Sequence, residues 1–171
     1  MSAKEHEQAA AGVVARCVVI TLSDTRTPAD DASGDRIAAL LEAGGHRLAR
    51  RLLLRDEPLE LAAALDNWLY RDDVDCVITT GGTGISARDR TIGVVRERLA
   101  AELPGFGEIF RQLSFDQVGP PAMLSRALAG ISGWPNPSAV FALPGSVKAV
   151  ELAKQRLVVP ILPHLLVQMR K

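Results

Sequence analysis

The first half of the chain alternates short apolar runs with segments of helical periodicity. Residues 13–22, 46–54 and 74–80 are largely aliphatic or β-branched and are bounded by turn formers, as buried strands are. Between them, residues 35–43 and 59–70 place apolar side chains three and four positions apart, which is typical of amphipathic helices. This order of strand, helix, strand, helix and strand predicts right-handed crossovers and a parallel sheet.

The second half is predicted to be mostly helical, with one further strand. Three helices in succession are expected at residues 92–103, 106–117 and 122–131. A compact strand follows at residues 139–143, and a last helical tract, residues 147–157, is expected to be interrupted by Pro160 and Pro163. The whole pattern predicts a three-layer α/β/α fold with a mostly parallel central sheet.

Composition fits this architecture. The chain has 171 residues, enough for one domain with a substantial core. Apolar residues make up 47% of it and aromatic residues only 4%, so the core is expected to be aliphatic. The polar and alanine-rich residues 1–12 are predicted to form a disordered tail, which leaves residues 13–171 as the single domain. Cys17 and Cys76 fall inside predicted strands and are expected to be buried free thiols.

Charge and hydropathy argue against two classes of partner. The formal net charge is zero, and no basic run offers the clustered cations that nucleic-acid binding needs. No segment approaches the roughly 20 apolar residues of a membrane span. The N-terminus also lacks the cationic and apolar regions of a signal peptide. We therefore expect no nucleic-acid partner, no membrane partner and a cytoplasmic location.

The strongest candidate for chemistry is the turn after the third predicted strand. Gly81, Gly82 and Gly84 can adopt backbone angles closed to other residues and leave main-chain amides open to a ligand. In open α/β sheets, ligands bind at the carboxyl ends of strands, where this turn is expected. It lacks the lysine of a Walker A loop, and the acid that a dinucleotide fingerprint requires would fall in a predicted helix and turn. A tight turn that only connects strand to helix remains the other interpretation.

Two aspartates are predicted to meet near this turn. Asp56 follows the second strand and Asp89 follows the glycine turn, and the carboxyl ends of parallel strands share one edge of a sheet. Converging carboxylates suit Mg²⁺ held against phosphate oxygens. Each could instead be a solvated charge or a cap. Other acidic residues compete for the same part, namely Asp24, Asp30, Asp31, Asp35 and Glu57.

A second strand-to-turn junction follows the strand at residues 139–143. Pro144, Gly145 and Ser146 open the next helix with free main-chain amides, a candidate anion site that could hold the other end of an extended ligand. Ser125 is placed beside Arg126 in a predicted helix, where its hydroxyl is as readily a surface or capping group as a binding one. No histidine spacing fits zinc.

Four motifs in order resemble the molybdopterin-binding MoaB/MogA family over nearly the whole chain. They are TTGGTG at residues 79–84 with Arg88 and Asp89 downstream, PGFGE at 104–108, LSR at 124–126 and LPGS at 143–146. Residues 30–35 and 110–115 resemble the B branch of the family in particular. The chain departs from the family at Ala87 and at residues 91–93, where many relatives have a Thr-Pro-Glu type helix start.

The resemblance implies an enzyme of molybdenum cofactor biosynthesis that assembles as a homotrimer or a dimer of trimers, with contacts to other proteins of that synthesis. Its reaction would join molybdopterin to ATP in the presence of Mg²⁺, giving adenylyl-molybdopterin and pyrophosphate. The aspartates at the positions of Asp56 and Asp89 would serve adenylyl transfer and hold the metal. The groups implied to hold the pterin and the phosphates are Thr80, Gly81, Gly82, Thr83, Gly84, Ser125, Pro144, Gly145 and Ser146.

Two other functions remain open from the sequence. A protein with the same site could bind molybdopterin and hand it on without adenylating it. Alternatively, the fold could serve assembly, because the apolar late helices at residues 106–113 and 158–169 could form subunit faces as well as core.

Overall fold

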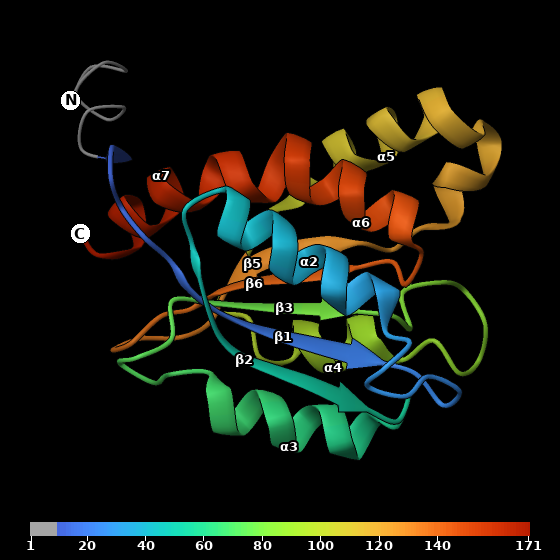
Figure 1. Ribbon diagram of the computed structural model, residues 1–171, viewed down its shortest axis with the longest axis horizontal. Coiled ribbons are helices and arrows are strands. Elements are labelled where there is room, and N and C mark those ends of the chain that lie inside the picture. The colour runs from blue at the N-terminus through green and yellow to red at the C-terminus, as the bar shows by residue number, and fades with distance from the viewer. Residues whose placement is uncertain (1–9) are drawn as a thin grey trace.

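A six-stranded sheet forms the centre of the molecule in the computed structural model, which describes residues 10–171 (Figure 1). Most of the predicted tail, residues 1–9, lies outside the described residues. The strands are β1 (Arg16–Leu22), β2 (Arg47–Leu54), β3 (Cys76–Thr80), β4 (Ala101–Glu102), β5 (Leu128–Ile131) and β6 (Ala139–Leu143). The helical elements are α2 (Ala32–Ala43), α3 (Pro58–Trp68), α4 (Thr91–Arg96), α5 (Pro104–Val118), the 3₁₀ turn η1 (Pro120–Leu124), α6 (Val147–Ala153), the π turn η2 (Lys154–Val158) and α7 (Val159–Met169).

The strand order is β2-β1-β3-β6-β5-β4, and β1, β2, β3 and β6 run parallel to one another. β5 is antiparallel to β6, and β4 is antiparallel to β5. The mostly parallel sheet is therefore confirmed. Since β1, β2 and β3 are adjacent and parallel, the loops that follow them emerge at one edge of the sheet, which we call the carboxyl edge.

Helices cover both faces of this sheet, as the three-layer fold predicts (Figure 1). Strand residues alternate between two aliphatic cores. Val19, Ile78 and Phe141 pack with residues of α2, α5, α6 and α7. Val18, Val77 and Val140 pack with residues of α3 and α4 on the other face.

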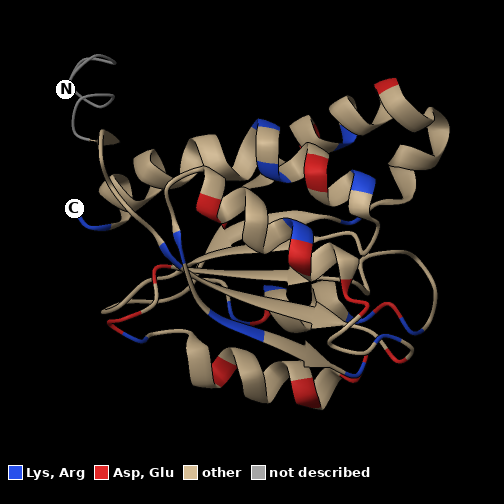
Figure 2. Cartoon of the chain, viewed as in Figure 1, with Lys and Arg blue, Asp and Glu red and all other residues tan. Residues whose placement is uncertain are grey.

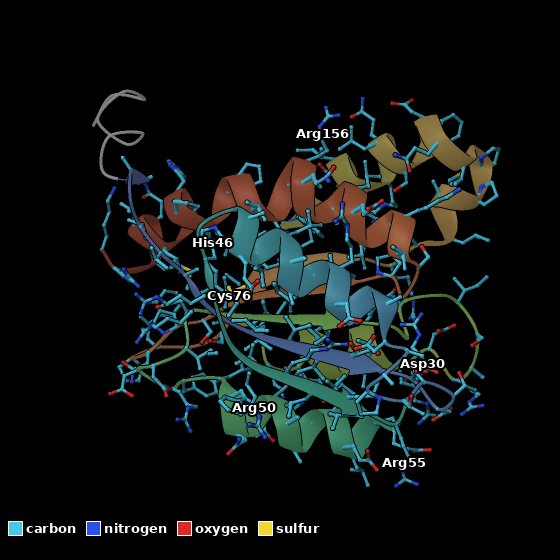
Figure 3. All side chains as sticks on the ribbon, viewed as in Figure 1. Asp30, His46, Arg50, Arg55, Cys76 and Arg156 are labelled. Atoms are coloured by element: carbon cyan, nitrogen blue, oxygen red, sulfur yellow. The ribbon has the colours of Figure 1, made fainter. Side chains whose placement is uncertain are left out.

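Two cysteines and a lysine are buried in the first of these cores. Cys17 and Cys76 are free and buried, as expected, and they oppose each other in register on β1 and β3. Figure 3 shows Cys76 in the interior, with Asp30 among the loops at the carboxyl edge. Lys154, the first residue of the π turn, is fully buried, and its Nζ has no hydrogen-bond partner. Burial lowers its pKa to about 8, although the two thiols favour the charged form.

The predicted helix at residues 122–131 is wrong. A short 3₁₀ turn ends at Leu124, and residues 128–131 form β5 instead. The alanine and leucine residues of this segment favour helix, but pairing with β6 overrides that weak preference. Gly130 shows why the strand fits, because a Cβ there would lie 2.6 Å from the carbonyl oxygen of Ala101 on β4.

Two other predicted helices have different boundaries. The helix expected at residues 92–103 ends at Arg96, and Ala101–Glu102 forms the edge strand β4. The last helical tract is not interrupted, because α6, η2 and α7 follow one another without a break. Pro160 is the second residue after the π turn and Pro163 lies inside α7, so neither proline ends the helix.

Charged residues of both signs surround the loops at the carboxyl edge (Figure 2). Within residues 10–171, every helix is too short or too polar to cross a bilayer.

Candidate functional site

The glycine turn at the end of β3 is pressed against neighbouring backbone and side chains. Gly81 and Gly82 have positive φ angles of 110° and 63°, which favour glycine. A Cβ at Gly81 would lie 2.5 Å from the carbonyl oxygen of Leu22, at the end of β1. A Cβ at Gly82 would overlap the hydroxyl of Thr91 and lie 2.9 Å from Asp56 Oδ1. The missing side chains therefore let the turn contact both β1 and the Asp56 carboxylate.

Asp56 and Asp89 both lie against this turn. Asp56 follows β2, and its Oδ1 approaches Gly82. Asp89 lies between the turn and α4, and its Oδ2 would be 2.9 Å from a Cβ at Gly84. The structure thus places the two predicted aspartates at one edge of the sheet, although 33 residues separate them in the sequence.

The pKa values of these two carboxyls shift in opposite directions. Partial burial raises the pKa of Asp56, and the nearby charges of Asp24 and Asp89 raise it further. The pKa of Asp89 is lowered by hydrogen bonds from Ser86, whose N–H donates to Asp89 Oδ2 at 2.7 Å. Like charges that face one another without enough cations are well placed to receive a cation from a ligand.

Asp24 connects the two aspartates, although the sequence offered it only as a competing carboxylate. Its Oδ1 accepts a hydrogen bond from the Asp56 N–H at 3.1 Å. Its Oδ2 pairs with the guanidinium of Arg88, next to Asp89 in the chain. Asp24 therefore holds the Asp56 loop in place and forms an ion pair with Arg88.

The other competing acids have structural partners or lie apart. Asp31 is buried, caps α2 through the Gly34 N–H, and pairs with Arg51 at 2.8 Å. Asp35 also pairs with Arg51, and Asp30 accepts hydrogen bonds from Thr27. Glu57 begins α3 without a side-chain capping bond.

Arg126 holds the segment of Ser125 against the glycine turn. Its N–H donates to the carbonyl of Thr83 at 3.0 Å, and its Nε donates to the carbonyl of Gly84 at 2.6 Å. A further donor of the guanidinium reaches the carbonyl of Asp89. Ser125 is extended rather than helical, so its predicted helical position is wrong, yet the structure does bring it to this site.

The second junction contacts the first directly. The Gly81 N–H donates to the carbonyl of Leu143 at 3.1 Å, and the Thr80 hydroxyl donates to the carbonyl of Pro144 at 2.9 Å. A Cβ at Gly145 would lie 3.4 Å from the Gly81 Cα. The two turns, from the adjacent strands β3 and β6, therefore form one continuous surface.

Two side chains at this second junction have defined partners. Ser146 caps α6 by accepting from the Ala149 N–H at 3.3 Å. Arg26, from the loop after β1, donates to the carbonyl of Gly145 at 3.1 Å and to the hydroxyl of Ser33. Arg26 thus brings a cation beside the turn, and no motif in the sequence singled it out.

Two cavities adjoin Asp89 and Ser125. One of about 570 Å³ lies between α3 and α4 and is lined in part by Asp89, Arg90 and Arg126. Another of about 350 Å³ is lined in part by Ser125, Arg126 and Arg111. Arg126 borders both, so there is space for an extended ligand on either side of it.

The carboxylates fit Mg²⁺ only together with a ligand. Among residues 10–171, no group of three or more histidine, cysteine, aspartate or glutamate side chains is close enough to hold a metal. Mg²⁺ usually takes one or two carboxylates and completes its shell with water and substrate phosphates. Asp56 and Asp89 supply carboxylates of that kind, and the adjacent amides and arginines suit phosphate.

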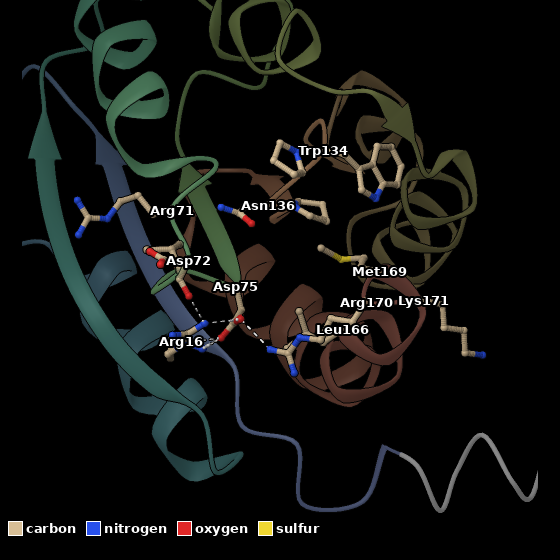
Figure 4. A pocket seen from close by; sticks show the side chains of 13 residues that line it. Arg16, Arg71, Asp72, Asp75, Trp134, Asn136, Leu166, Met169, Arg170 and Lys171 are labelled. Atoms are coloured by element: carbon tan, nitrogen blue, oxygen red, sulfur yellow. Dashed lines mark hydrogen bonds and ion pairs between the residues drawn. The ribbon is translucent and has the colours of Figure 1, made fainter.

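A different cavity, of about 480 Å³, lies at the amino end of the parallel strands (Figure 4). Its wall includes Trp134, Arg16, Arg170 and Asp75. Asp75 accepts from Arg16 Nε and from Arg170, each at 2.8 Å, so its charge is already matched inside the protein. None of the predicted site residues lines this cavity.

Comparison with known proteins finds close relatives in sequence and in fold. Residues 18–164 match the family described as probable molybdopterin binding domain. Molybdenum cofactor biosynthesis protein B of Halalkalibacterium halodurans is 43% identical over 172 aligned positions, which cover 100% of this chain and 99% of that protein. The protein of the same name from Bacillus subtilis gives the same identity and coverage.

Solved structures of this kind have the same fold. A crystal structure of molybdenum cofactor biosynthesis protein B has a TM-score of 0.87 and 40% identity, covering 92% of this chain and 96% of its own. The tungsten cofactor synthesizing protein MoaB from Pyrococcus furiosus has a TM-score of 0.82 and 35% identity, covering 92% and 98%.

Proposed function

Because the chain belongs to the molybdopterin-binding MoaB/MogA family and has a role in molybdenum cofactor biosynthesis, we propose that it is a molybdopterin adenylyltransferase. In this reaction a phosphate oxygen of molybdopterin attacks the α-phosphorus of ATP. The bond from that phosphorus to the leaving pyrophosphate breaks, and adenylyl-molybdopterin forms.

The observation that carries the proposal is that the Asp56 and Asp89 carboxylates both lie against the glycine turn. Nucleotidyl transfer depends chiefly on positioning and on neutralising phosphate charge. A divalent cation bound between phosphates and these carboxylates would supply that neutralisation. Asp56 and Asp89 are the residues that would hold it, and Asp24 would keep the Asp56 loop in place through its N–H.

The remaining residues bind and orient the substrates in this proposal. Main-chain amides of residues 82–84 bind phosphate oxygens, and the Gly81 N–H, Thr80 and Gly145 keep the two turns together. Ser125, which lines the cavity of about 350 Å³, and the turn at residues 144–146 bind the pterin end. Arg26 and Arg126 reduce the negative charge that two phosphorylated substrates bring.

Self-association as a homotrimer or a dimer of trimers is part of the proposal, with other proteins of the same synthesis as further partners. An apolar cavity of about 330 Å³ on α5, η2 and α7 supports it. The cavity is lined by side chains that include Phe106, Ile109 and Ile161, of which Ile109 is 49% and Ile161 is 42% exposed. Size-exclusion chromatography with light scattering measures the mass of the protein in solution. A monomer at micromolar concentration would contradict the proposed self-association.

The catalytic part is tested by mixing the pure protein with molybdopterin and Mg-ATP. Pyrophosphate is expected in proportion to the adenylyl-molybdopterin formed. A family member with demonstrated activity serves as the positive control in the same assay. If that control turns over and this protein binds molybdopterin without releasing pyrophosphate, it is a binding protein and not a transferase. Binding of neither substrate would leave assembly as its function.

A further inference from the structure

Thr91 carries a hydroxyl that the fold leaves without a partner. The residue is 2% exposed, and its Oγ1 makes no hydrogen bond. Arg90 occupies the capping position of α4, and Thr91 is the first residue of that helix. Buried hydroxyls are nearly always paired, because an unpaired one loses its hydrogen bonds to water without replacement. This donor therefore requires an explanation.

The position of Gly82 shows which group is near it. A Cβ on Gly82 would overlap Thr91 Oγ1 and would lie 2.9 Å from Asp56 Oδ1. The two oxygens thus approach the same point beside the glycine turn, and no side chain at Gly82 separates them. One is a donor without an acceptor, and the other belongs to a carboxylate with acceptor sites to spare.

Asp56 is held in its loop through its backbone rather than through its carboxylate. Its N–H donates to Asp24 Oδ1 at 3.1 Å, and Asp24 pairs with Arg88. The carboxylate can therefore rotate toward Thr91 when a magnesium polyphosphate occupies the glycine turn.

We infer that Thr91 is a positioning residue for Asp56: its hydroxyl donates to Asp56 Oδ1 when a magnesium polyphosphate is bound, and holds the carboxylate against the glycine turn. The inference rests on the proposed function for the class of ligand. It adds a residue and a contact that act through Asp56 and do not touch the reacting atoms.

The experiment measures the affinity of the full chain for magnesium pyrophosphate by calorimetry, together with its melting temperature without ligand. Thr91→Val keeps the shape and removes the hydroxyl. We expect about a tenfold weaker Kd, from the loss of one hydrogen bond to a charged group. The melting temperature should stay the same or rise, because the lost hydroxyl had no partner. Thr91→Ser restores the hydroxyl and should recover the wild-type Kd within about twofold.

Two further variants separate this effect from a general change in the fold. Thr79→Val removes another buried threonine hydroxyl without a partner, one that is not among the atoms nearest to Gly82, and should leave the Kd unchanged. In an Asp56→Ala background, Thr91→Val should change the Kd by less than about twofold, because the partner is gone.

Equal affinity of the wild type and Thr91→Val, including no binding by either, overturns the inference. So does a lower melting temperature of Thr91→Val, or an equal loss in the Asp56→Ala background. Pyrophosphate release from ATP and molybdopterin is scored separately. The wild type could bind magnesium pyrophosphate through Thr91 and yet produce no pyrophosphate from ATP and molybdopterin. That result would refute the proposed adenylyltransferase activity and leave the role of Thr91 standing.

Discussion

An aspartate at each edge of the sheet lies in opposite electrostatic surroundings. The amino edge is the one at which the parallel strands begin, opposite the carboxyl edge. At the amino edge, burial alone would raise the pKa of Asp75, but hydrogen bonds from Arg16 and Arg170 hold it below its usual value. At the carboxyl edge, burial raises the pKa of Asp56, and Asp24 and Asp89 raise it further. The first carboxylate has all its charge matched by the protein, whereas the second faces an excess of like charge.

This difference separates a structural aspartate from one available to a ligand. The cavity beside Asp75 is large, about 480 Å³, and contains an exposed tryptophan. Its volume alone would make it a candidate site. The balance of charge argues otherwise, because a carboxylate that already accepts from two guanidiniums has little left to offer a cation. At the carboxyl edge the missing cation is what a metal-bound substrate would bring.

The largest expected effect is on turnover at the carboxyl edge. Asp89→Asn keeps an acceptor for the Ser86 N–H but removes the charge, so we expect adenylyl transfer to fall at least about a thousandfold, or about 4 kcal/mol. Asp56→Asn should act in the same direction. Pyrophosphate release measures it, and circular dichroism verifies the fold. Retained turnover in Asp89→Asn would remove the contrast between the two edges.

Lys154 tests how much folding stability is lost when an ionisable side chain is buried without a partner. It lies away from both edges of the sheet. Its pKa of about 8 in the folded protein is lower than the ordinary 10.5, so the charged form is penalised by folding. Lys154→Met should raise the free energy of unfolding by about 3 kcal/mol at pH 7. The gain should shrink between pH 8 and 10.5, where the wild-type lysine loses its charge. Urea titrations at several pH values measure it, with the exposed Lys148→Met as control. A gain that does not depend on pH would point to packing instead.

Asp75→Asn should have the converse effect to Asp89→Asn, lowering stability while leaving turnover intact. Removing the charge leaves Arg16 and Arg170 without a counter-ion, but both are partly exposed, so we expect a loss of about 2 kcal/mol. Because the folded pKa is depressed, this contribution is present above the ordinary carboxyl pKa of about 4 and is lost as the pH falls. Asp73→Asn, which removes an exposed charge paired with Arg71, is the matched control. Equal stability of the two variants at pH 7 would contradict a structural part for Asp75.

The smallest effect concerns the stability cost of Asp56. Since its folded pKa is raised, its contribution to stability is present below the ordinary pKa of about 4 and is lost as the pH rises. Asp56→Asn should therefore be slightly more stable than the wild type at pH 7, by up to about 1 kcal/mol, and equal to it at pH 3. Chemical denaturation at both pH values decides this. Lower stability at pH 7 would show that the ionised carboxylate is well satisfied without a ligand.

The sequence predicts the parallel half of the fold and the meeting of its loops. The strand at residues 139–143 has the predicted bounds, and Asp56 and Asp89 lie at one edge because their strands are parallel neighbours of β1. The helix predicted at residues 122–131 was wrong because the local preference for helix competes with strand pairing, which only the folded sheet provides. The sequence also could not predict the contacts of Arg26 and Arg126. They join side chains to carbonyls 37 to 119 residues away, and such contacts leave no periodic signal.

The two outer strands of the sheet limit how copies of the protein can associate. β4 has only two residues, and its Glu102 is paired with Arg96. β2, at the opposite border, carries Arg47, Arg50 and Arg51. A very short border strand and a charged one both disfavour the addition of a strand from another chain, which is a common route to aggregation. They leave the helices and loops as the surfaces through which copies of this protein can associate, with each sheet complete in its own subunit.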